Sequence, residues 1–246
     1  MQTVLILGAT SSIARAVAGE FASHGYDLIL AGRDCEEMQT QAADLEIRYD
    51  VKARVYPFDA LDLESHETIL ARCLSDTGER LAGAVLCVGY LGDQNAAQTD
   101  FREARRILDT NFTGCVSALN VISNHFEKQG SGFICALSSV AGDRGRQSNY
   151  FYGAAKAALS AYLQGLRNRL HRAGVRVVTV KPGFVDTRMT FGRPNLFLVA
   201  SPQSVARGVY KAATDGKGVV YLPWYWRWIM LVVRLIPERV FKRMRL

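Results

Sequence analysis

The sequence predicts one α/β domain built on a doubly wound, seven-stranded parallel sheet, and three observations lead to this prediction. Short apolar runs with few charges alternate with segments of helical periodicity, which is typical of strands covered on both faces. The 246 residues suffice for one large core but hardly for two. No repeat, low-complexity tract or linker interrupts the chain. Right-handed crossovers between the parallel strands then give the doubly wound arrangement.

The elements follow in order from these patterns. Strands are expected at 3–7, 27–31, 52–58, 84–88, 132–137, 175–180 and 218–222. Helices are expected near 12–24, 35–49, 63–75, 100–128, 150–173 and 202–214. In the first helix Ile13, Val17 and Phe21 recur every four residues and form one apolar stripe, which Gly25 is expected to end. Residues 1–222 should form the domain and residues 223–246 a C-terminal amphipathic tail.

Composition excludes several classes of function. Six basic residues and one acidic residue lie from Gly218 onward, so much of the net charge of +7 belongs to the tail and nucleic-acid binding is not expected. Five cysteines without a C-x-x-C pair indicate a reducing, cytoplasmic setting. The four histidines are scattered, so no metal site is predicted. No uncharged apolar run approaches the ~18 residues that span a bilayer.

The first expected strand runs directly into a turn of small residues and then into a helix. The turn reads Gly8-Ala9-Thr10-Ser11-Ser12-Ile13-Ala14. At such a junction, backbone N–H groups and the helix N-terminus can face a pyrophosphate. The cofactor is therefore expected to contact Gly8, Thr10, Ser11, Ser12 and Ile13. The alternative is an ordinary strand–helix turn capped by Ser11 or Ser12.

The end of the second expected strand bears on the choice of cofactor. It reads Ala31-Gly32-Arg33, without the acidic residue that binds adenosine hydroxyls and repels a 2′-phosphate. The guanidinium of Arg33 suits a phosphate group. The sequence therefore favours NADP(H), with NAD(H) as a possible alternative. If Arg33 only stacks on the adenine, the preference stays open.

Four further residues indicate chemistry. A spacing of four places Tyr152 and Lys156 on one face of a helix. Ser139 ends a strand on the side where open α/β sheets bind ligands, and Asn111 lies in a long helical segment. The alternative is an amphipathic helix whose lysine reaches out to solvent.

These motifs follow one another along the chain in the order found in the short-chain dehydrogenase/reductase family. The sequence resembles that family over nearly its full length. The matching pieces are Gly8 with Ser11 and Ile13, Asp59, Gly89, Asn111, Ser138-Ser139, Tyr152 with Lys156, and Pro182-Gly183 leading to Val185 and Thr187. The chain departs from the family pattern in the turn, at Leu7, Ser12 and Ala14. It departs again at Leu86-Cys87-Val88, in whose place the family usually has Asn-Asn-Ala.

The resemblance implies a Rossmann-type fold and a role for each matching residue. Tyr152 would be the general acid in ketone reduction, Ser139 would orient the substrate oxygen, and Asn111 would anchor a water in a proton relay. Lys156 would stabilise the phenolate and hold the nicotinamide ribose. The remaining cofactor contacts would come from Asp59, Ala60, Gly89, Pro182, Gly183, Val185 and Thr187.

Two segments bear on the substrate. The loop 142–149 joins Ser139 to Tyr152, so Arg144 and Arg146 are expected to border the pocket and to meet an anionic group. A solvated loop is the alternative. The segment near 188–201 corresponds to the family's substrate lid, and its apolar residues favour a lipid-like substrate. The alternative for the lid is packing against a partner subunit.

The resemblance extends to a branch of the family that reduces a keto-pentose carried on polyprenyl phosphate. It rests on residues 58–62, residues 90–93 and the tail. It implies a lipid-linked keto sugar as substrate, a partner oxidase that makes the ketone, and a homo-oligomer. The alternatives are a reductase of another long-chain keto lipid, such as 3-ketosphinganine, and a non-catalytic nucleotide-sensing scaffold.

The tail combines aromatic, aliphatic and basic residues. Arg227 and Arg234 fall on one stripe of an otherwise apolar helix that Pro237 ends. Beyond it, Val240, Phe241 and Met244 should share one face, opposite Arg239, Lys242, Arg243 and Arg245. This pattern predicts peripheral contact with the cytoplasmic face of a membrane. The alternative is packing across an oligomer interface.

Overall fold

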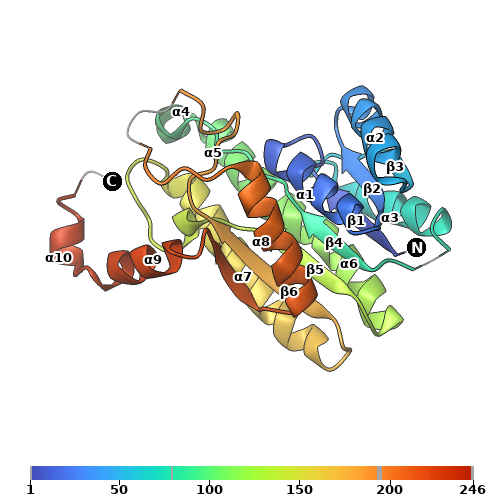
Figure 1. Cartoon of the computed structure of the whole chain (residues 1–246). Helices are drawn as coiled ribbons and strands as arrows, with labels where there is room; N and C mark the ends of the chain where they lie inside the picture. The colour runs from blue at the N-terminus through green and yellow to red at the C-terminus, as the bar shows by residue number, and fades with distance from the viewer. Residues whose placement is uncertain (1, 79, 193–195, 245–246) are drawn as a thin grey trace.

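The sheet is parallel throughout and contains seven strands. The computed structural model describes residues 2–78, 80–192 and 196–244 (Figure 1). The sheet order is β3-β2-β1-β4-β5-β6-β7, which confirms the predicted doubly wound arrangement. The strands are β1 (Thr3–Leu7), β2 (Asp27–Gly32), β3 (Ala53–Pro57), β4 (Gly83–Leu86), β5 (Phe133–Leu137), β6 (Arg176–Pro182) and β7 (Val219–Leu222).

Helices cover both faces of the sheet, because alternate residues of each buried strand point to opposite sides. Val4 and Ile6 of β1 pack on the side of α1 (Ser12–Ser23), α2 (Cys35–Tyr49) and α8 (Pro202–Asp215). Leu5 and Leu7 pack on the side of α3 (His66–Ser75), α6 (Gly114–Gln129) and α7 (Tyr150–His171). The result is the three-layered domain that the sequence predicts.

The helix expected at 100–128 is divided into three parts. It consists of α5 (Phe101–Leu108), a π-helical turn (Asp109–Thr113) and α6. The side chain of Asn111 explains the interruption, because its Nδ2 donates to the carbonyl of Ile107 at 2.8 Å and takes the acceptor that an α-helix would give to the backbone. A further short helix, α4 (Gln94–Thr99), was not predicted, although Asp93 caps its first amides.

The tail forms α9 (Trp226–Leu235) and α10 (Glu238–Phe241), separated at Pro237 as expected. It is not a free appendage. Trp226 is 2% exposed and packs so closely on Gly183 that any side chain at position 183 would collide with its indole. Phe241 is also buried, whereas Val240 and Met244, which are expected to share its face, are exposed. No helix among the described residues is long and apolar enough to cross a membrane.

Candidate active site

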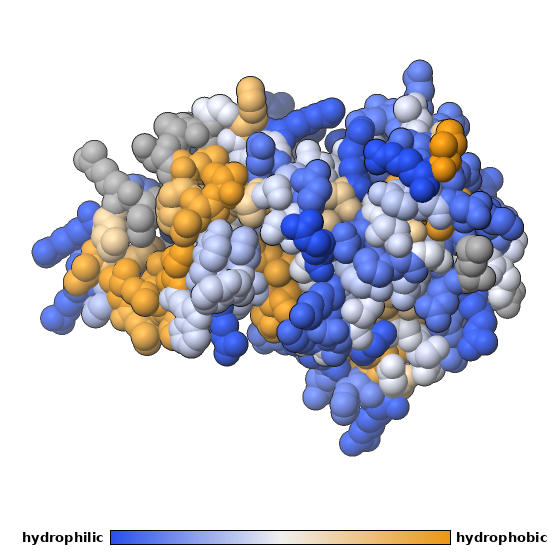
Figure 2. All heavy atoms as spheres, viewed as in Figure 1, coloured by the Kyte–Doolittle hydropathy of each residue, from blue (hydrophilic) through white to orange (hydrophobic). Residues whose placement is uncertain are grey.

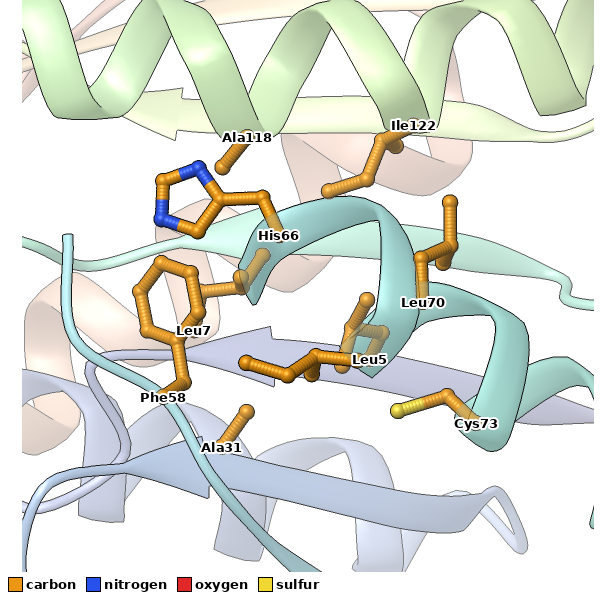
Figure 3. A pocket seen from close by; sticks show the side chains of 10 residues that line it. Leu5, Leu7, Ala31, Phe58, His66, Leu70, Cys73, Ala118 and Ile122 are labelled. Carbon is orange, nitrogen blue, oxygen red and sulfur yellow. The ribbon is translucent and has the colours of Figure 1, made fainter. Parts of the chain in front are cut away.

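The carboxyl ends of the parallel strands meet at one edge of the sheet and carry the expected site residues. Gly8 follows β1, Arg33 follows β2, and Ser139 lies two residues after β5. A separate void under α3, lined almost entirely by apolar side chains (Figure 3), measures only about 10 Å³. That volume holds one water at most. The void is therefore a packing defect and not a ligand site. The candidate site is the edge of the sheet that carries Gly8, Arg33 and Ser139.

The turn after β1 has the geometry that a pyrophosphate requires. Gly8 adopts a φ of +77°, and a side chain there would come within 3.1 Å of the backbone of Cys87 and Val88. Ser11 accepts the amide of Ala14 at 3.1 Å. Among the described residues, no acceptor lies within hydrogen-bond reach of the amides of Ser12 and Ile13. Free amides at a helix N-terminus suit an anion, so the turn fits the nucleotide.

Basic side chains surround the end of β2. Arg33 is exposed and forms no ion pair with the described residues. Glu37, on the first turn of α2, is already paired with Arg15 and lies 3.7 Å from Arg188. The end of β2 therefore keeps a free guanidinium where a 2′-phosphate would bind.

Two of the expected cofactor-binding residues, Asp59 and Ala60, follow β3. Asp59 Oδ1 accepts the amide of Leu61 at 3.0 Å, which fixes the carboxylate in the turn. The backbone carbonyl of Ala60 packs directly against Gly114 of α6. His66 bonds the Asp59 carbonyl at 3.0 Å and Ser117 at 2.9 Å. These contacts hold the loop that would border the adenine.

Lys156 does not reach out to solvent. It is 2% exposed, and its Nζ donates to the carbonyl of Val88 at 3.2 Å and to that of Leu137 at 3.1 Å. These carbonyls follow β4 and end β5, so the ammonium is held between the two strand ends. Its Nζ lies 5.7 Å from the ring centre of Tyr152, one turn earlier on α7. The alternative of an amphipathic helix whose lysine reaches out to solvent is therefore wrong.

Ser138 and Ser139 have different tasks. Ser138 Oγ donates to the Lys156 carbonyl at 2.9 Å and bonds Ser160 at 2.7 Å, which ties β5 to α7. Ser139 Oγ accepts the amide of Ala141 at 3.1 Å. That contact leaves the hydroxyl hydrogen of Ser139 available to a substrate oxygen, because no acceptor for it occurs among the described residues.

Asn111 approaches the same place from the π-helical turn. Its amide exchanges hydrogen bonds with the backbone of Tyr90 in both directions and is fully buried. A Cβ at Gly89 would lie 3.7 Å from Asn111 Oδ1 and 3.9 Å from Lys156 Nζ. The structure therefore gathers Asn111, Gly89 and Lys156 at one point. The Cε of Met189, a residue of the expected lid, would lie 3.6 Å from that Cβ.

Burial affects the two cysteines nearest to Lys156. Burial raises the pKa of Cys87 to about 12 and that of Cys115 to about 11, although the Lys156 charge lowers both. Both thiols therefore stay neutral at pH 7 and behave as small apolar residues. No group of three or more metal-binding side chains occurs in the described part of the chain.

The loop between Ser139 and Tyr152 corrects one expectation. Arg144 does not face the pocket. Its Nη1 donates to the carbonyls of Val233 at 2.7 Å and Ile236 at 2.6 Å, and Nη2 lies 3.0 Å from Glu238. Its guanidinium also lies 3.8 Å from the ring centre of Phe241. Arg144 therefore caps the C-terminus of α9 and is no longer assigned to the substrate.

Three polar groups near the start of α7 have no hydrogen-bond partner among the described residues. They are the Nε of Arg146, the Nε2 of Gln94 and the Oδ1 of Asn149, all buried. Burial also lowers the pKa of Arg146. Gln94 Oε1 accepts the amide of Phe151 at 3.3 Å, which places Gln94 beside Tyr152. Only Arg146 was expected from the sequence; Gln94 lies on the helix that the sequence did not reveal. We call these residues the polar trio.

The segment after β6 reaches over the site. Gly183 bonds the Leu222 carbonyl, Val185 bridges to Ala200, and the hydroxyl of Thr190 donates to the Val185 carbonyl. Thr187 is partly buried within the same turn. Residues 193–195 of the expected lid lie outside the described residues. Their described neighbours Phe191, Phe197 and Leu198 are exposed, and the lid stays a prediction.

Comparisons with known proteins agree with this geometry. The family described as short chain dehydrogenase matches residues 2–194. An uncharacterised oxidoreductase of Mycobacterium tuberculosis is 37% identical over 98% of this chain and 96% of the relative. A serine 3-dehydrogenase of Agrobacterium fabrum is 31% identical over 88% and 90%. A solved short-chain dehydrogenase from Sphingobium yanoikuyae in complex with NADPH is 26% identical, with a TM-score of 0.83 over 95% of this chain and 93% of that one.

Proposed function

Since this chain belongs to the short-chain dehydrogenase/reductase family and is an oxidoreductase that binds NADP(H), we propose that it reduces a lipid-linked ketone to an alcohol. The observation that carries the proposal is the buried ammonium of Lys156. It is held by two carbonyls at strand ends, and its Nζ lies 5.7 Å from the ring centre of Tyr152, one helical turn earlier. Lys156 pairs with no carboxylate among the described residues, and because a buried cation without such a partner is costly, this supports a role for Lys156 in the reaction.

The bound cofactor supplies the hydride, and the residues of this chain orient the ketone and move the proton. The hydroxyl of Ser139 donates a hydrogen bond to the carbonyl oxygen. Tyr152 transfers its phenolic proton to the same oxygen as the alcohol forms. The positive charge of Lys156 favours the phenolate that remains. Asn111 fixes the Tyr90 backbone beside Lys156 and keeps that side of the site in place.

Two features support a polyprenyl-phosphate keto-pentose as the substrate. The exposed apolar lid suits a lipid chain, and the polar trio offers donors and an acceptor to a sugar phosphate. A guanidinium that is partly buried without an acceptor at Nε gains most from an anionic ligand. The proposal includes a partner oxidase, which must make the ketone, a homo-oligomer, and a cytoplasmic enzyme held at the membrane surface through its tail.

The substrate class is tested by oxidation of NADPH with a polyprenyl-phosphate keto-pentose, its dephosphorylated analogue and 3-ketosphinganine. Replacement Arg146→Gln should lower kcat/KM for the phosphorylated ketone by about 10-fold to 100-fold, as for loss of a charged hydrogen bond. The dephosphorylated analogue should be affected little. Arg172→Gln, at the exposed far end of α7, is the matched control.

Three other outcomes would change the proposed substrate or the proposed activity. Equal losses for both ketones would remove Arg146 from phosphate recognition. Reduction of 3-ketosphinganine alone would replace the sugar lipid by a sphingoid base. Tight NADPH binding without reduction of any ketone would favour a nucleotide-sensing scaffold.

A further inference from the structure

The outward side of α9 is apolar as well as the inward side. At 100° per residue, Trp226 and Met230 fall on the side that packs against Val140 and is buried. The opposite arc carries four exposed apolar residues of α9: Trp228, Leu231, Val232 and Leu235. Trp228 is 57% exposed and Leu235 is 73% exposed. A surface helix of a globular protein normally has a polar outer face, so this arc requires a partner.

The lid continues the same surface. The ring of Phe197 lies 5.6 Å from that of Trp226, and the hydroxyl of Tyr225 donates to the Leu198 carbonyl at 3.2 Å. Phe197 and Leu198 are themselves about half exposed. Figure 2 shows hydrophobic residues gathered at the end of the molecule that carries α9. We define the docking surface as Trp224, Trp228, Leu231, Val232 and Leu235 of the tail with Phe197, Leu198 and Val199 of the lid.

The charges beside the docking surface identify its occupant. Arg227 and Arg234 fall on one edge of the exposed arc of α9, and further basic residues follow on and after α10: Arg239, Lys242 and Arg243. All five are exposed and none forms an ion pair with a described residue. The only acidic residue of the tail, Glu238, is already paired with Arg144.

A second copy of this chain, seated on the same surface by two-fold symmetry, would bring these basic edges together without acids to balance them. Anionic lipid headgroups supply the missing charge, and interfacial tryptophans with a basic border are typical of membrane-surface helices.

We propose that the docking surface binds an anionic bilayer through the tail and residues 197–199 together, so that this side of the site faces the lipid. The tail is fixed to the domain by Trp226 and by Arg144, which sets the orientation of the whole surface. This part of the inference rests on the proposed function: the lipid chain of the substrate then reaches the site from the bilayer, past Phe197 and Met189. Met189 lies beside the site, because a Cβ at Gly89 would be 3.6 Å from Met189 Cε and 3.9 Å from Lys156 Nζ.

The first experiment measures co-sedimentation of the full chain with vesicles of phosphatidylcholine alone or with added phosphatidylglycerol. The wild type should sediment with the anionic vesicles. Trp228→Glu/Leu235→Glu should remain in the supernatant, whereas Ile47→Glu should not differ from wild type. Ile47 is 86% exposed on α2, away from the docking surface. Arg227→Glu/Arg234→Glu should weaken binding about 30-fold or more, from ~1 kcal/mol per basic residue lost. Arg207→Glu/Lys211→Glu, an exposed pair on α8, is the charge-matched control.

The second experiment tests the lid directly. A polarity-sensitive fluorophore is attached to Leu198→Cys in a Cys35→Ser background, since the other four cysteines are buried. Its emission should shift to the blue with anionic vesicles, while the same label on Ile47→Cys should not respond. NADPH affinity, measured in every variant, should be unchanged and shows that each variant folds.

Two results would overturn the proposal. One is vesicle binding by the tail without a response of the Leu198 label, because the lid would then lie outside the surface. The other is a wild type that ignores vesicles but forms a dimer that Trp228→Glu/Leu235→Glu dissociates. Neither measurement uses a ketone, so failure of the proposed reaction would leave both results unaffected.

Discussion

Lys156 links the helical pattern of the sequence to the chemistry of the site. A spacing of four indicates that Tyr152 and Lys156 share a face of α7, but it does not say whether the lysine is buried. Burial depends on the carbonyls of Val88 and Leu137, which lie 68 and 19 residues away in the chain. Those strand ends become neighbours only when the sheet forms. The sequence thus predicts that Lys156 shares a helix face with Tyr152, but it does not predict that the ammonium is buried between two strand ends.

Tyr152→Phe should lower kcat by at least ~100-fold, the usual scale for loss of a general acid. NADPH affinity should stay near that of the wild type, because the substitution removes one hydroxyl and leaves Lys156 in place. Stopped-flow single turnovers and NADPH fluorescence titration measure the two quantities. Wild-type turnover of any verified ketone by this variant would disprove the role of Tyr152.

Arg33→Ala should weaken NADPH binding by about 1.5–3 kcal/mol, as for loss of a hydrogen bond to a charged group, and should hardly affect NADH. Calorimetric titration with both cofactors measures the difference. Arg48→Ala, on the far end of the neighbouring helix α2, is a suitable control. Equal losses for both cofactors would show that Arg33 only stacks on the adenine.

At the scale of elements, periodicity located every strand and the long helices, because each pattern is local and long enough to be read. It missed α4, which has only six residues, and the π-helical turn, which depends on the bond from Asn111 to the Ile107 carbonyl. It also could not show that Arg144 contacts a tail some 90 residues later. From sequence alone, Arg144 and Arg146 look equivalent. In the structure Arg144 bonds the end of α9, whereas Arg146 lies just before α7 with its Nε buried.

Arg144→Ala should destabilise the docked tail. The variant loses charged hydrogen bonds to two partly buried carbonyls and the contact with Phe241, so the free energy of unfolding should fall by about 2–3 kcal/mol. Hydrogen exchange should accelerate selectively in α9 and α10. Arg102→Ala, which breaks an exposed ion pair with Asp100, should change little. Unchanged exchange in the tail of Arg144→Ala would show that Trp226 alone holds it.

For the whole molecule, the topology followed from the sequence because parallel strands with right-handed crossovers allow few arrangements. The same topology brought the expected site residues to one edge of the sheet. The docking of the tail could not be predicted in this way, since an amphipathic helix is equally compatible with a membrane, a subunit and its own domain. The structure shows that α9 uses one side for its own domain and leaves the other side exposed.

The contact between Arg144 and α9 joins the loop that carries Ser139 to the helix that presents Trp228 outward. Two sites whose ligands both shift the conformational equilibrium of one element are thermodynamically coupled, and the coupling free energy is the same in both directions. If a bilayer orders α9, it also orders the loop and strengthens ketone binding. By reciprocity, a bound ketone must then strengthen membrane attachment by the same factor. The enzyme would be retained at the surface while it holds substrate and released more readily once the alcohol has left.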